Sequence, residues 1–319
     1  MSITEFRPPL GLGHGHIQTI LGSSLRKLAV PRRAFGVRGS EKEETFTARD
    51  GTRLVAWISE QPEQPEPVPL IVIIHGWLGT HNSGYNLSLA ESLWTNGFNV
   101  ARLNLRDHGG TTHLNKGMFH NGLIEEVVDV VGQIQHRYQE MAVVGFSLGG
   151  NFALRLAKAI KVPALGVCPL MDPSASVAAV DAGWSVYKSY FMRKWLRALD
   201  EKSAAFPELY QFRSSGAYAL KTVGDMTAHF IEHYTDYSTL QDYYDCYTLT
   251  GSVLEGVDAS IIAAADDPVV PAIGFEGLPT SLSVKVMPKG GHCAFIDSYR
   301  MTSYVDGYIS QHFEQLFRK

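Results

Sequence analysis

A strand, a sharp turn and a helix follow one another within Met141–Asn151, and Ser147 stands at the turn. Gly145 and Gly149 lie two residues to either side, where side chains would collide with the strained turn or with the crossing helix. The turn places the Ser147 hydroxyl at the carboxyl end of a strand and at a helix N-terminus, whose free N–H groups stabilise developing negative charge. The segment therefore predicts an exposed nucleophile, provided that the chain supplies a base and a residue that orients the base. Without them, the segment is a Gly-Ser turn that has no catalytic role.

Buried-strand patterns alternate with helical periodicity around this segment, which predicts an α/β fold with a mostly parallel central sheet flanked by helices. The remaining strands are expected at Pro69–Ile74, Phe98–Leu105, Val162–Leu170, Ala259–Ala265 and Ser281–Met287, and the helices at Asn86–Asn96, Asn121–Tyr138 and Tyr299–Phe317. An Asp50-Gly51 turn between two alternating segments predicts an antiparallel hairpin at one edge. The first forty residues are expected to be irregular and to pack against the main body.

The alternation stops between residues 174 and 257, where aromatic and polar residues follow a mostly helical pattern. We interpret residues 1–173 and 258–319 as the α/β core and residues 174–257 as a helical lid inserted after the carboxyl end of a strand. Ligands of α/β proteins bind at that end of the sheet, so the insertion would cover the pocket. The alternative is a surface appendage away from the site.

Composition restricts the classes of partner. The 319 residues carry a formal net charge of −4 and no basic patch is expected, which argues against a nucleic-acid partner. The three cysteines, Cys168, Cys246 and Cys293, lie far apart and lack metal-ligand spacing, so we expect a reducing compartment with neither disulfides nor zinc. No apolar run reaches membrane-spanning length. We expect a cytoplasmic protein without a cofactor; the oligomeric state cannot be inferred.

Serine needs an adjacent base, and the base needs a group that orients it. The order serine, acidic residue, histidine is one of the known orders of such triads, and here each candidate follows a predicted strand. His292, after Gly290-Gly291, is the best candidate for the base. Asp266 and Asp267 compete as the orienting carboxylate, and we favour Asp267 because a D-P-x-x-P turn begins there.

An oxyanion formed at the substrate carbonyl would need two backbone donors. One is the N–H of Leu148, which directly follows the nucleophile. The second is expected in the loop after the first central strand, where we assign the Trp77 N–H and keep Leu78 as the fallback. His75, in the same loop, is interpreted as a structural hydrogen-bonding residue.

Histidines elsewhere raise a metal interpretation. His108, His113 and His120 follow a strand end, together with Asp107, and His14-Gly-His16 has an H-x-H spacing. Gaps of five and seven residues do not place the first three on one helical face, and a complete triad makes a metal redundant. We therefore predict no metal and assign His108, His113 and His120 to shaping the pocket or holding its loop.

Short motifs spread over nearly the whole chain resemble the YheT-like α/β-hydrolases. They are H-x-Q-T at His16–Thr19, His-Gly-x-x-Gly at His75–Gly79, Asn-x-Arg at Asn104–Arg106, Phe-His-x-Gly at Phe119–Gly122, G-x-S-x-G-G-N at Gly145–Asn151, D-D-P at Asp266–Pro268 and G-G-H at Gly290–His292. The chain departs from many members after Arg106, where it has Asp-His-Gly-Gly in place of Gly-Cys-Ser/Gly. The resemblance implies hydrolysis of carboxylic esters through an acyl-enzyme.

The predicted function is a serine carboxylic-ester hydrolase acting on short- to medium-chain acyl esters, with a small-molecule acyl ester or lipid-like compound as the substrate. Two alternatives stay open. An alcohol in place of water would resolve the same acyl-enzyme and make the protein an acyltransferase. A hydrolase-like binding protein with a catalytically silent pocket is the other alternative, although it gives no reason for the triad residues at three strand ends.

Overall fold

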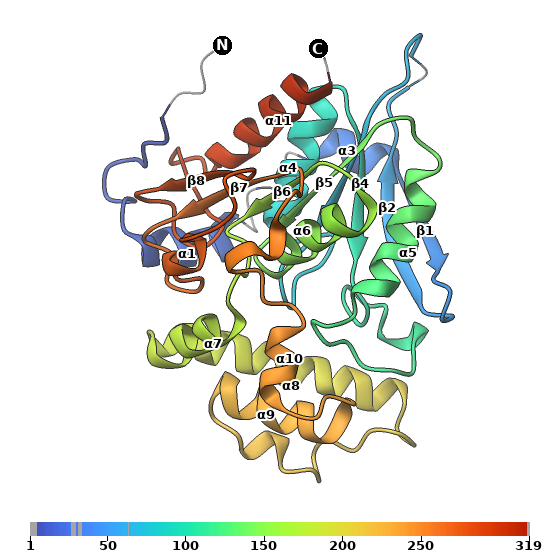
Figure 1. The fold of residues 1–319 in the computed structure, drawn as a ribbon, viewed down its shortest axis with the longest axis vertical. Coiled ribbons are helices and arrows are strands. Elements are labelled where there is room, and N and C mark those ends of the chain that lie inside the picture. The colour runs from blue at the N-terminus through green and yellow to red at the C-terminus, as the bar shows by residue number, and fades with distance from the viewer. Residues whose placement is uncertain (1–4, 27–29, 31–33, 63, 318–319) are drawn as a thin grey trace.

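The computed structural model describes residues 5–26, 30, 34–62 and 64–317. An eight-stranded sheet in the order β1-β2-β4-β3-β5-β6-β7-β8 forms its centre (Figure 1). Strand β2 pairs antiparallel with β1 and β4, and the other five pairs are parallel. The strands are β1 (Glu41–Thr47), β2 (Arg53–Ser59), β3 (Leu70–Ile74), β4 (Asn99–Asn104), β5 (Met141–Phe146), β6 (Ala164–Val167), β7 (Ala259–Ala264) and β8 (Ser283–Met287). The predicted α/β class, the mostly parallel sheet and the hairpin at its edge are confirmed.

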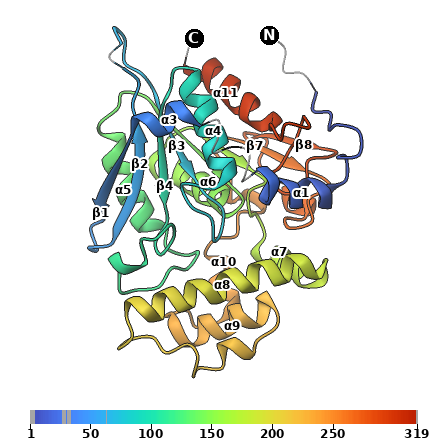
Figure 2. The ribbon, with the colours of Figure 1, turned by 180° about the vertical axis from the view of Figure 1, so that it is seen from behind.

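Helices cover both faces of the sheet, which explains why the inner strands read as continuous apolar runs. Every residue of β3, β4, β5 and β7 is buried. Residues of α5 (Ile124–Gln135) and α6 (Leu148–Ile160) pack into one core, and those of α4 (Gly84–Thr95) and α11 (Tyr304–Phe317) into the core on the other face (Figures 1 and 2). Apolar burial of this extent is the main favourable term in folding.

The N-terminal region is more regular than expected. Helices α1 (Gly15–Ser23) and α3 (Phe35–Ser40) occupy parts of the stretch predicted to be irregular, and residues 1–4, 27–29 and 31–33 of that stretch lie outside the described residues. The prediction was wrong because α1 has no regular apolar stripe and is held by polar contacts to other parts of the chain. The last helix also begins at Tyr304 instead of residue 299, since a turn at 297–302 precedes it.

A helical insertion leaves the sheet after β6 and returns to it at β7. It contains α7 (Pro173–Ala182), α8 (Ser185–Ala205), η3 (Ala217–Ala219), α9 (Val223–Tyr234), α10 (Leu240–Asp245) and η4 (Gly251–Leu254), and this fully described stretch has no strand. Both views place its helices together at one end of the sheet. The division into core and lid stays a prediction. No helix among the described residues is long and apolar enough to cross a membrane.

Candidate active site

Ser147 links β5 to α6 in a backbone conformation that side chains rarely adopt, with φ 55° and ψ −118°. A Cβ at Gly145 would lie 2.0 Å from Gly149 O, and a Cβ at Gly149 would lie 2.3 Å from Ile74 O. Both glycines are therefore required for the close approach of β3, β5 and α6. The Ser147 N–H donates to Val167 O at 2.9 Å, which fixes the turn against β6.

Three predicted site residues meet at the carboxyl ends of β5, β7 and β8. The Nε2 atom of His292 lies 2.9 Å from Ser147 Oγ, and its Nδ1 atom lies 2.8 Å from Asp267 Oδ2. Because a carboxylate only accepts hydrogen bonds, Nδ1 carries the proton and the lone pair of Nε2 faces Ser147. Burial is the largest single influence and lowers the pKa of His292, but Asp267 and Cys293 together outweigh it through charge and hydrogen bonding, so the net pKa is well above its ordinary value.

The two neighbouring aspartates have different partners. Asp267 Oδ1 accepts from the N–H groups of Val269 and Val270 at 2.8 and 3.0 Å, leaving Oδ2 for His292. Asp266 instead accepts from the Gly291 N–H at 2.9 Å. The D-P-x-x-P turn thus orients Asp267 toward the imidazole, while Asp266 holds the loop that carries it.

Helix α1 supports the His292 loop, a role that the sequence analysis missed. Thr19 Oγ1 accepts from the His292 N–H at 2.9 Å. The fully buried Gln18 side chain donates to Ile296 O at 3.2 Å and accepts from Ile296 N at 2.7 Å. On its other side, His16 Nδ1 lies 2.8 Å from Tyr187 Oη in α8. The H-x-Q-T motif was the available signal, and its three polar residues join the His292 loop to the helical insertion.

The loop after β3 runs close to Ser147, and a Cβ placed on its Gly76 would lie 3.3 Å from Ser147 Cβ. The N–H groups of three of its residues have acceptors inside the protein: Gly76 donates to Tyr85 Oη at 3.0 Å, Leu78 to His108 Nε2 at 3.2 Å and Gly79 to Gly76 O at 2.9 Å. For the Trp77 N–H, no acceptor is found among the residues that the structure describes. Leu148 is the first residue of α6, where an N–H has no partner within its helix.

His75 and His108 make hydrogen bonds that hold the loop after β3 in place. His75 Nδ1 lies 2.8 Å from Gly76 O and its Nε2 accepts from the Leu105 N–H at 3.2 Å. His108 Nδ1 lies 2.7 Å from Arg106 O. Carbonyl oxygens only accept, so both rings are neutral with the proton on Nδ1. Burial lowers the pKa of His108 to about 4 and that of His75 well below its usual range.

The three histidines considered as metal ligands in the sequence do not converge. Within the described part of the chain, the ligand atoms of His108, His113 and His120 do not form a group of three at metal-binding distance. A different trio does, because Cys168, His292 and Cys293 place ligand atoms within 4.8 Å of one another. Thiols and an imidazole are donors that suit zinc. A metal there would compete for the His292 Nε2 atom that faces Ser147.

Comparisons with known proteins identify the family to which this fold belongs. A family model described as the alpha/beta hydrolase fold matches residues 69–299, so the chain belongs to the α/β hydrolase fold family. Within that family the chain is YheT-like, as its motifs predicted. It is 26% identical over 311 residues to "Putative esterase YheT" of Escherichia coli strain K12, covering 92% of this chain and 88% of that protein. The chain is thus a hydrolase of an esterase-like family.

Solved structures support the fold alone. The esterase Pf2001 of Pyrococcus furiosus superposes with a TM-score of 0.54 at 14% identity, covering 86% of this chain and 92% of that one. The alpha/beta hydrolase domain-containing protein 10 from mouse gives a TM-score of 0.54 at 13% identity, with coverage of 86% and 99%.

Proposed function

We propose that the chain is a serine carboxylic-ester hydrolase that acts through an acyl-enzyme on short- to medium-chain acyl esters. Ser147 Oγ attacks the ester carbonyl while His292 Nε2 takes its proton. The imidazolium then returns the proton to the leaving alcohol, and Asp267 keeps the ring oriented and stabilises its charge. Water, activated by the same imidazole, releases the acid from Ser147.

The observation that carries this proposal is the unbroken line of hydrogen bonds from Asp267 through His292 to Ser147. Its two distances, 2.8 and 2.9 Å, lie within the range in which a base can abstract a proton directly. The strained Ser147 backbone gives further support, since unfavourable conformations of this kind cluster at functional sites.

The Trp77 and Leu148 N–H groups are our proposed oxyanion donors. Their support is that neither N–H has an acceptor among the described residues, whereas the Leu78 N–H already donates to His108. Donors that are fixed before the reaction stabilise the developing charge without reorganisation, and one such donor contributes about 10²–10³ in kcat in other enzymes.

The acyl chain is proposed to lie against the aromatic side of the same loop. The Trp77 ring stacks on Phe191 with centroids 5.4 Å apart and meets Trp195 edge-on at 4.9 Å. Both partners belong to α8, so the helical insertion covers the apolar side of the site. We therefore retain residues 174–257 as the proposed lid.

Hydrolysis of p-nitrophenyl esters from acetate to palmitate tests the proposal. We expect a maximum at short to medium chain length, and a loss of about 10⁴-fold or more in kcat for Ser147→Ala by analogy with other triads. Full activity in Ser147→Ala, or none at any chain length in the folded wild type, would refute a serine esterase. Ester products formed in the presence of added butanol would identify an acyltransferase.

A further inference from the structure

Helix α8 contacts the backbone of the proposed oxyanion loop through a lysine. Lys194 Nζ donates to Leu78 O at 2.6 Å, and the Trp77 ring of the same loop packs between Phe191 and Trp195. The helix therefore touches Trp77 through its side chain and Leu78 through its carbonyl. An ammonium that donates to a carbonyl makes a charge-assisted bond, which is stronger and more directional than a contact between apolar groups.

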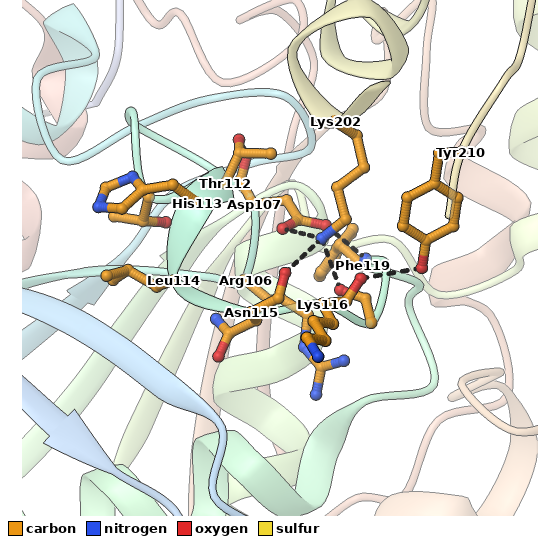
Figure 3. Close-up of polar contacts among 12 residues, drawn as sticks. Arg106, Asp107, Thr112, His113, Leu114, Asn115, Lys116, Phe119, Lys202 and Tyr210 are labelled. Atoms are coloured by element: carbon orange, nitrogen blue, oxygen red, sulfur yellow. Dashed lines mark hydrogen bonds and ion pairs between the residues drawn. The ribbon is translucent and has the colours of Figure 1, made fainter. Parts of the chain in front are cut away.

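A second lysine of α8 enters the loop that follows β4. Lys202 is 1% exposed, and its Nζ donates to Asp107 Oδ1 at 2.9 Å, Asn115 O at 2.7 Å and Gly117 O at 2.8 Å (Figure 3). Asp107 Oδ2 accepts from the Phe119 N–H at 2.9 Å. An ammonium has three N–H donors, and each of those of Lys202 is used. The side chain therefore binds three residues of this loop at once.

Lys202 and Asp107 form a largely buried ion pair, in which each charge needs the other. Burial lowers the pKa of Lys202 and raises that of Asp107, so desolvation works against both charges. Each charge is compensated by the other and by the surrounding hydrogen bonds. Removing one partner would leave the other charge buried without compensation, which makes the pair a strong constraint on where α8 sits.

The two lysine contacts converge on one residue. Asp107 precedes His108, whose Nε2 accepts from the Leu78 N–H at 3.2 Å. The Leu78 N–H is thus fixed by the loop that Lys202 holds, and the Leu78 C=O is fixed by Lys194. Leu78 has φ 56°, a left-handed conformation that a leucine keeps only where its surroundings impose it.

We propose that Lys194 and Lys202 are positioning residues through which helix α8 sets the geometry of the oxyanion-binding loop. Neither lysine is assigned a contact with the reacting atoms. Together they hold Leu78 in its left-handed conformation and so direct the preceding Trp77 N–H toward the site. The inference rests on the proposed function, because it takes the Trp77 N–H to be an oxyanion donor. It makes the helical insertion part of the catalytic apparatus as well as a cover.

The test compares Lys194→Met and Lys202→Met with Lys188→Met, a control on the same helix whose Nζ donates to Asp181 O within the insertion at 3.4 Å. Methionine keeps the length of the stem and removes the charge and the donors. We expect kcat for p-nitrophenyl butyrate to fall about 10- to 100-fold in the two test variants, with KM within about threefold of wild type. Lys188→Met should match the wild type.

A trifluoromethyl ketone inhibitor separates positioning from a merely structural role. It forms a tetrahedral adduct with serine whose oxygen requires the oxyanion donors. Its affinity should weaken in parallel with kcat in Lys194→Met, and Lys194→Arg, which retains a cationic donor, should recover part of both. Circular dichroism melting identifies any unfolded variant, and if Lys202→Met does not fold, the partly buried Lys194 decides the test.

Two results would overturn the inference. One is an unchanged kcat in folded Lys194→Met, and the other is a rise in KM with unchanged kcat and inhibitor affinity, which would mean that α8 only covers the pocket. Either result leaves the proposed function intact, provided that Ser147→Ala abolishes activity in the same assay. Retained activity in Ser147→Ala would instead refute the proposed function, whatever the lysine variants do.

Discussion

Replacing Thr19 by valine tests whether helix α1 positions the proposed base. The change keeps the shape of the side chain and removes the Oγ1 atom that accepts from the His292 N–H at 2.9 Å and donates to Gly15 O at 2.8 Å. A buried donor left without a partner costs about 1–3 kcal/mol. At about 2–4 °C per kcal/mol for a chain of more than 150 residues, a loss near the middle of that range lowers the melting temperature by roughly 4–8 °C.

The effect on activity should exceed the effect on stability. A displacement of about 1 Å at a reacting group costs on the order of 10²-fold, so we expect kcat to fall about 10- to 100-fold in Thr19→Val while KM changes little. Steady-state kinetics with p-nitrophenyl butyrate and thermal melting measure the two effects. Thr19→Ser, which keeps the hydroxyl, is the matched control and should stay near wild type. A wild-type kcat in a folded Thr19→Val protein would refute the reasoning.

Two predictions concern pH. Because the pKa of His292 is raised and the base must be neutral, kcat/KM should increase with pH through a midpoint above 6.5. The Asp267→Asn variant should lower this midpoint and should also lower kcat by about 10⁴-fold. A midpoint that Asp267→Asn leaves unchanged would contradict the pairing of Asp267 with His292. The pKa of His108 is about 4 in the folded protein against about 6.5 in the unfolded chain, so the unfolded state binds the proton first and up to about 3 kcal/mol of stability is lost between pH 6.5 and 4. In His108→Gln, urea unfolding across that range should show a smaller loss, and an unchanged loss would assign the acid sensitivity to other groups.

The central sheet could be predicted because its sequence signal is local. Strands β3, β4, β5 and β7 are apolar along their whole length, a pattern that burial on both faces requires. The candidate triad could be predicted from the expected strands, because parallel strands bring their carboxyl ends to one edge of the sheet. Residues that follow different strands, such as Ser147 and His292, then meet although they lie far apart in the sequence.

The polar supports of the site could not be predicted, because long-range contacts define them. Thr19 lies in a helix without a clear apolar stripe, and only the folded chain shows that its hydroxyl faces the His292 N–H. Lys202 reads as a solvated lysine of a polar helix, yet it is 1% exposed and bound to Asp107. Cys168 and Cys293 are far apart in the sequence, whereas the Cys293 N–H donates to Cys168 Sγ at 3.4 Å.

Labelling with a fluorophosphonate tests the central claim most directly, because this reagent forms a stable bond only with a serine activated by a neighbouring base. The folded protein is incubated with the reagent, and mass spectrometry counts the adducts and locates them on peptides. We predict one adduct per chain, on Ser147, with labelling abolished in Ser147→Ala and strongly slowed in His292→Ala. Labelling of another residue, or a folded protein that takes no label, would contradict the assignment of Ser147 and His292 as nucleophile and base.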